Sequence, residues 1–141
     1  MPFKIIIGEK GKAWRIESTS ESIVGKAIGD KISGSDIDAK LEGYEFEITG
    51  GTDIAGFPMY KEVEGIGLKR VLFTKGWGMK DSTEGMRRRK SVRGKVISDR
   101  IVQINLKVSK HGHQKLSEIF AEQNVKEQAK SAEQKAEAPA A

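Results

Sequence analysis

The residues of this chain best suited to chemistry are five cations within ten residues. The run Gly85–Gly94 contains four arginines and one lysine. Guanidinium groups offer planar forks of donors that match phosphate oxygens, and so much like charge repels itself unless a polyanion lies alongside. The run therefore favours contact with a phosphate backbone. A solvated loop whose charges protect a strand edge is the simpler alternative, and charge alone also allows DNA, a membrane or an acidic protein.

The basic run lies within a longer electropositive block. The 141 residues carry a net charge of +5, but residues 69–115 hold 14 basic and 3 acidic residues, a net charge of +11. Residues 1–68 are net −4 and residues 116–141 are net −2. Charge concentrated in one block is typical of a nucleic-acid interface, so we predict RNA as the partner. Trp77, close to the run, is a candidate for stacking on a base.

Other motifs give weaker signals. The loop Gly50–Met59 lacks the Gly-Lys-Ser/Thr ending of a phosphate-binding loop, and Gly65–Gly67 is only a fragment of a dinucleotide fingerprint. His111 and His113 would need further metal ligands, and a turn at the end of a strand is the better interpretation. Ser91 follows two arginines and a lysine as in a basophilic kinase site, a match that arises by chance in basic proteins.

Nothing in the sequence assembles a nucleophile, a base and an orienting group. Glu45 and Glu47 lie on the same solvated side of an alternating strand, and an enzyme would have to rest on them, Asp53 and the two histidines. The chain has no cysteine, which excludes disulfides and thiolate metal sites and suits a reducing cytosol. No apolar stretch approaches the roughly 20 residues of a membrane helix. We predict no enzyme activity, cofactor, metal, small-molecule substrate or membrane contact.

The elements that must position the basic run are predicted to be strands. Residues 3–7 and 13–17 favour an opening hairpin, residues 44–49 alternate with their aromatic side chains inward, and residues 71–74 favour another strand. Ser91–Ser98 and Ile101–Lys110 indicate a strand pair joined at Asp99 and Arg100. About six strands at hairpin spacing predict a mainly β fold, a small antiparallel β-barrel.

The C-terminal part changes period. Leu116, Ile119 and Phe120 fall at helical spacing, which predicts a short docking helix over residues 114–125. Residues 126–141 favour helix but have nothing apolar to bury, so we expect a helix-prone or disordered tail. Residues 1–113 would then form the β-barrel RNA-binding domain.

Three segments resemble the S6e family of archaeal and eukaryotic small-subunit ribosomal proteins. They are Gly50–Met59, Gly85–Gly94 and Gln103–Val108, in the order and spacing of the family, and the resemblance covers about residues 1–115. It implies a small protein of the small ribosomal subunit that contains a β-barrel, binds ribosomal RNA and catalyses no reaction. The short, acidic-leaning tail lacks the serine-bearing extension of eukaryotic members and resembles the archaeal form.

The resemblance also implies which residues act. The basic run supplies the candidate RNA contacts Arg87, Arg88, Arg89, Lys90 and Arg93. Charge alone adds the weaker candidates Lys69, Arg70, Lys75, Lys80 and Lys95. The residues expected to shape the partner loop are Gly50, Gly51, Asp53, Gly56, Phe57 and Pro58.

The expected partners are ribosomal RNA of the small subunit and neighbouring ribosomal proteins, in the cytoplasmic ribosome. The alternative is a stand-alone β-barrel interaction module, similar to a translation factor, whose basic block meets an acidic protein partner.

Overall fold

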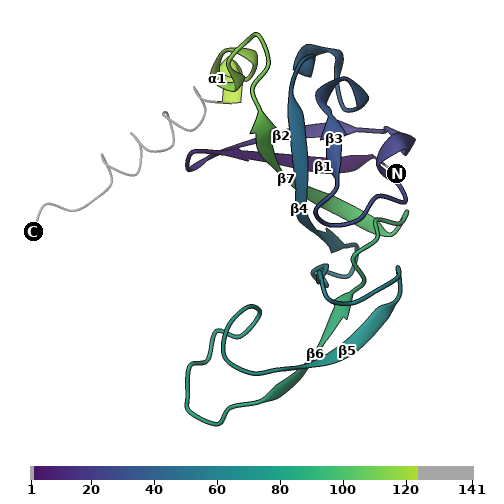
Figure 1. Cartoon of the computed structure of the whole chain (residues 1–141), viewed down its shortest axis with the longest axis vertical. Coiled ribbons are helices and arrows are strands. Elements are labelled where there is room, and N and C mark those ends of the chain that lie inside the picture. Colours follow the sequence, from purple (N-terminus) through teal and green to yellow (C-terminus); the bar gives the residue numbers. More distant parts are fainter. Residues whose placement is uncertain (1, 124–141) are drawn as a thin grey trace, which may run out of the picture.

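The computed structural model describes residues 2–123, which form two lobes of unequal size (Figure 1). The larger lobe is a five-stranded sheet and the smaller one is a two-stranded hairpin. The strands are β1 (Phe3–Glu9), β2 (Lys12–Ser18), β3 (Lys31–Ser33), β4 (Glu45–Asp53), β5 (Leu68–Phe73), β6 (Arg88–Arg93) and β7 (Ile101–Lys110). The helical elements are the 3-10 turns Glu21–Ile23, Gly34–Asp36 and Ala39–Leu41 and the helix α1 (Leu116–Ile119).

The larger sheet has the order β2-β1-β7-β4-β3. Strand β1 pairs antiparallel with β2, as predicted, but it runs parallel to β7, which in turn is antiparallel to β4. The prediction of a mainly β fold is confirmed. The closed antiparallel barrel is not: the sheet is mixed, and β2 and β3 form its two edges. Strand β3 has only three residues, too few to reach around and pair with β2.

Alternation of apolar residues explains how this sheet holds its core. The side chains of Ile5, Ile7, Phe46 and Ile104 point to one face and are fully buried there. The alternation predicted for residues 44–49 is confirmed, since Tyr44, Phe46 and Ile48 are all buried. The sheet therefore has a continuous apolar face.

Strand β6 does not pair with β7, so the predicted hairpin over residues 91–110 is wrong. It pairs with β5 instead, and these two strands enclose a small second cluster of Val63, Phe73 and Val92. The extended run breaks at Gly94, where a Cβ would lie 1.8 Å from the carbonyl oxygen of Gly65. Beyond Gly94 the chain crosses to the larger lobe, where Val96 bridges to Ala27.

The helix predicted after residue 114 is present as α1, a single turn. Leu116 is buried, and Ile119 and Phe120 pack against the core of the sheet. The ring of Phe120 stacks on Trp14 of β2, with 6.4 Å between the centroids. The predicted tail, residues 126–141, lies outside the described residues.

Candidate nucleic-acid interface

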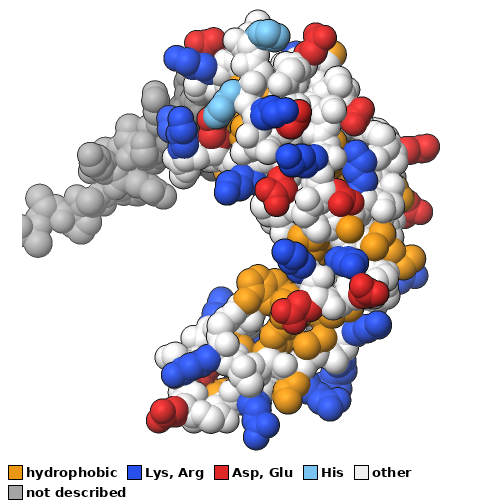
Figure 2. All heavy atoms as spheres, in the orientation of Figure 1, with side chains coloured by type: hydrophobic (Ala, Val, Ile, Leu, Met, Phe, Trp, Pro, Cys, Tyr) orange, Lys and Arg blue, Asp and Glu red, His pale blue; other side chains and the backbone are white. Residues whose placement is uncertain are grey.

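The basic run is a strand for most of its length. In β6, Arg88 lies opposite Phe73 of β5, Arg89 opposite Leu72, and Lys90 opposite Val71. Directly opposite residues in an antiparallel pair share a face, and successive residues alternate between faces. The sequence predicts a strand only from Ser91 onward, whereas β6 begins at Arg88, and its alternation sends the cations to both sides of the hairpin. Figure 2 shows Lys and Arg side chains around this lobe.

One face of the hairpin carries a basic cavity. Lys80, Arg88 and Lys90 line a cavity of about 480 Å³ together with Asp81, Gly78 and Met79. The Lys90 Nζ donates to the carbonyl oxygen of Gly78 at 2.6 Å. Hydrogen bonds from the hydroxyl and the amide of Thr83 hold the pKa of Asp81 below its usual value. Three cations around one cavity are well placed to bind phosphate oxygens.

The opposite face mixes arginine with exposed apolar side chains. Arg70 and Arg89 lie there beside Leu68 and Leu72, which are about half exposed. The other candidates Arg87, Lys69 and Lys75 are also exposed. The strand pairing thus brings Lys80, Arg88 and Lys90 to one cavity, while Arg70 and Arg89 lie behind them.

Arg93 differs from the rest of the run because all its side-chain nitrogens are engaged. Its Nε and Nη2 contact one carboxylate oxygen of Asp53 at 2.9 and 2.8 Å, and Nη1 donates to the carbonyl oxygen of Ile66 at 3.1 Å. The side chains of Arg93 and Asp53 are 11% and 5% exposed. Lys95 is also paired: its hydrogen bond to Glu64, at 3.1 Å, and its charge hold the pKa of Glu64 below its usual value.

The Asp53–Arg93 ion pair joins the two long motifs found in the sequence. Gly50, Gly51 and Asp53 belong to β4, and the chain then turns sharply. Gly56 adopts a φ of 87° there, and the amide of Asp53 bonds to the carbonyl of Phe57. Phe57 is half-buried and Pro58 is exposed. The carbonyl of Pro58 accepts from the amide of Arg93, and the amide of Tyr60 donates to the carbonyl of Arg93.

An aromatic group lies beside this junction. The rings of Tyr60 and Trp77 stack with centroids 4.7 Å apart, and Phe73 meets both of them. The sequence indicated Trp77 as a base-stacking candidate but gave no signal for Tyr60, because their pairing depends on how the loop after β5 folds back. The group presents Trp77 with 52% of its surface exposed.

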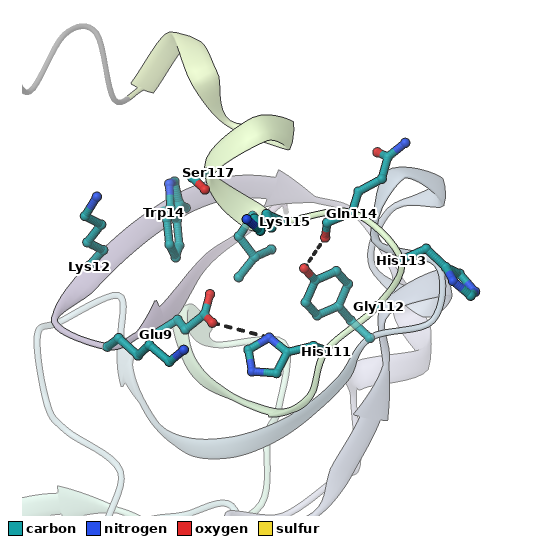
Figure 3. A pocket seen from close by; sticks show the side chains of 12 residues that line it. Glu9, Lys12, Trp14, His111, Gly112, His113, Gln114, Lys115 and Ser117 are labelled. Atoms are coloured by element: carbon teal, nitrogen blue, oxygen red, sulfur yellow. Dashed lines mark hydrogen bonds and ion pairs between the residues drawn. The ribbon is translucent and has the colours of Figure 1, made fainter.

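A separate cavity of about 560 Å³ opens at the far end of the larger lobe (Figure 3). His111 Nδ1 lies 3.3 Å from a carboxylate oxygen of Glu9, and the hydroxyl of Tyr44 donates to the carbonyl of Gln114. Burial raises the pKa of Tyr44, and the nearby charge of Glu9 raises it further. His111 follows the end of β7, where the sequence predicted a turn.

The described residues contain no cluster of three or more histidine, cysteine, aspartate or glutamate side chains able to hold a metal ion. Among residues 2–123, no helix has the length and apolar character to cross a bilayer.

Comparison with known proteins defines the class. The family described as Ribosomal protein S6e matches residues 3–121, so this is a ribosomal protein. Similar curated proteins are each named small ribosomal subunit protein eS6. The relative from Archaeoglobus fulgidus is 43% identical over 125 residues, which cover 85% of this chain and 96% of that protein. The relative from Methanococcus maripaludis strain S2 is 44% identical over 114 residues, which cover 79% of this chain and 90% of that protein. The relative from Nanoarchaeum equitans is 46% identical over 122 residues, which cover 84% of this chain and 90% of that protein.

The chain belongs to the S6e family of ribosomal proteins, in its archaeal form. It is a structural protein rather than an enzyme.

Proposed function

We propose that the chain is a structural constituent of the small ribosomal subunit in the cytoplasm, and that it holds ribosomal RNA through the β5–β6 hairpin. The observation that carries the proposal is the basic cavity of Lys80, Arg88 and Lys90 on one face of the hairpin, with Arg70 and Arg89 on the other. Cations on both faces allow a thin hairpin to lie between two RNA segments. Phosphate contacts of this kind fix position and register without reading sequence.

The individual contacts follow from the surroundings of each cation. Exposed cations without an acidic partner among residues 2–123, such as Arg87 and Arg89, retain their full charge for phosphate. Arg93 instead serves the protein's own structure, because each of its three side-chain nitrogens already contacts Asp53 or Ile66. Neighbouring ribosomal proteins are further partners in this proposal, and the exposed Leu68 and Leu72 suit such contacts better than phosphate.

The test is a charge-removal series measured against salt. Replacing Arg87, Arg88 and Arg89 together with alanine should weaken binding to small-subunit ribosomal RNA and leave the melting temperature nearly unchanged. The log–log slope of affinity against salt should become shallower by roughly 0.7 to 0.9 for each phosphate that the variant no longer neutralises. The matched control replaces three exposed lysines of the larger lobe, Lys4, Lys31 and Lys40, which removes the same charge. Equal effects of the two triple variants would overturn the hairpin assignment.

A further inference from the structure

A third cavity, of about 320 Å³, lies where the two lobes meet. Its walls come from β4 and β7 of the larger sheet and from the aromatic group of the smaller lobe. Ligand pockets start at about this volume, so the space suits one small planar group rather than a whole cofactor.

The aromatic wall is formed by Trp77 on Tyr60. Trp77 lies between Gly76 and Gly78, whose φ angles of 122° and 77° belong to the left-handed region. These two glycines bend the chain so that the indole lies against Tyr60, with 24° between the ring planes. Half of Trp77 is still exposed at the cavity. An exposed aromatic ring that is held flat is a platform for a nucleic-acid base, because every base has a π face.

The floor is formed by Gly50, where glycine is not needed by the fold. Its φ is not among the left-handed ones, and a Cβ built there meets nothing within 4 Å. It lies at an irregularity in the β4–β7 pairing, between Ile48 and Gly50. A glycine within a strand often marks a place where a ligand approaches the backbone. A side chain here would meet no other atom of the protein within 4 Å, and Gly50 itself lines the cavity.

Polar groups lie at the edge of the cavity. Asn105 Oδ1 accepts from Gln103 Nε2 at 3.0 Å, which leaves the amide N–H groups of Asn105 without a partner among the described residues. Lys61 is exposed at the rim and has no ion pair within residues 2–123. Amide donors can bond the edge of a base, and a nearby ammonium can meet the phosphate attached to it.

We propose that this cavity binds one unpaired base of RNA, stacked on Trp77, with its edge toward Asn105 and its phosphate toward Lys61. The proposal rests on the RNA-binding function proposed above and adds a base contact to the phosphate contacts of the hairpin. Bases splayed out of loops and bulges are the usual targets of such sites.

The test compares RNA with and without bases. Binding of the full chain to the octaribonucleotides A8, U8 and C8 is measured by fluorescence anisotropy, alongside an abasic ribose-phosphate octamer of the same charge. The wild type should bind at least one base-containing octamer roughly tenfold or more tightly than the abasic one. Trp77→Ala and Gly50→Val should remove that preference, and Trp77→Phe should retain most of it. These changes should alter the salt slope by no more than the one phosphate contact of Lys61, because they leave every cation in place.

Two controls separate the site from general loss of structure. Leu72→Ala removes an equally exposed apolar side chain from the other face of the hairpin and should leave the preference intact. Gly50→Val lies on a strand of the larger sheet, so it tests the cavity even if Trp77→Ala loosens the smaller lobe. Equal binding of abasic and base-containing octamers overturns the base site and leaves the phosphate contacts standing. Failure to bind any octamer at low salt counts against both proposals.

Discussion

Arg88 and Arg93 belong to the same strand, yet their surroundings differ completely. Arg88 is exposed and lines a basic cavity with Lys80 and Lys90. Arg93 lies in a buried ion pair with Asp53 and also bonds a carbonyl oxygen of the loop at residue 66. At the scale of single residues, arginine is therefore exposed beside a basic cavity at one end of β6 and held in an ion pair at the other.

The ion pair gives a prediction for stability. Asp53→Ala should lower the free energy of unfolding by about 3 kcal/mol, because it leaves the guanidinium of Arg93 largely buried without its counter-charge. Urea denaturation followed by circular dichroism measures the change. Glu64→Gln, which breaks an exposed pair with Lys95, is the control and should leave the unfolding midpoint almost unchanged. A destabilisation at Asp53 no larger than that at Glu64 would show that the buried pair is not structural.

The sequence could show where the cations are concentrated, but it could not show which partner each cation has. The excess of cations over residues 69–115 is visible in composition, and ten of those fourteen cations lie between Lys69 and Lys95, in the part of the chain that forms β5, β6 and the loops around them. The partner of Arg93 is 40 residues away, and nothing in the spacing of Asp53 identifies it. Tyr60 and Trp77 likewise meet only through the fold. Local patterns do not encode such long-range pairings.

At the scale of elements, the pairing of β4 with β7 depends on how closely two backbones approach. A Cβ at Gly51 would lie 2.6 Å from the carbonyl oxygen of Gln103 and 2.9 Å from the sulfur of Met59. A Cβ at the neighbouring Gly50 would meet nothing. Close packing thus requires glycine at position 51 of β4, whereas at position 50 it does not.

Gly51→Ala should therefore destabilise the protein by about 1–3 kcal/mol, the usual cost of overpacking, because backbone must move to admit the methyl group. Gly50→Ala is the matched control and should be neutral or slightly stabilising, since alanine restricts the unfolded chain more than glycine does. Chemical denaturation of the two variants side by side measures the difference. Equal stabilities would mean that β4 and β7 are not in close contact at this point.

The strands themselves were largely predictable, and their partners were not. Alternation located β2, β4 and β7, because one face of each lies on the core, and a run of β-branched residues located β1. Adjacent strands were expected to pair as hairpins, which holds for β1 with β2 but fails for β6 with β7. Alternation identifies which face of a strand is buried. The residues within and around β1 and β7 do not indicate that these two strands pair in parallel.

At the scale of the whole molecule, stability should be unequal between the lobes. The larger lobe holds a core of many buried side chains, whereas the smaller lobe relies on Val63, Phe73 and Val92. This small cluster predicts that the hairpin opens more readily than the sheet, as elements with small cores do.

Val92→Ala should lower the hydrogen-exchange protection of amides in β5 and β6 and leave that of β1 and β7 almost unchanged. Ile104→Ala, in the middle of the larger sheet, should lower protection throughout, because it weakens the core on which the whole fold depends. Exchange followed by NMR or mass spectrometry measures both variants. A decrease in protection spread evenly over both lobes in Val92→Ala would contradict separate opening.

The parallel pairing of β1 with β7 has a consequence for how the chain is made. Ile5 lies beside Ile104, and β7 fills the middle of the sheet between β1 and β4. A nascent chain emerges from its N-terminus, so the β1–β2 hairpin and β4 appear long before the strand that unites them. Until residue 110 has left the ribosome that synthesises it, both have an unpaired inner edge and an uncovered apolar face. The nascent chain is most prone to aggregation during that interval.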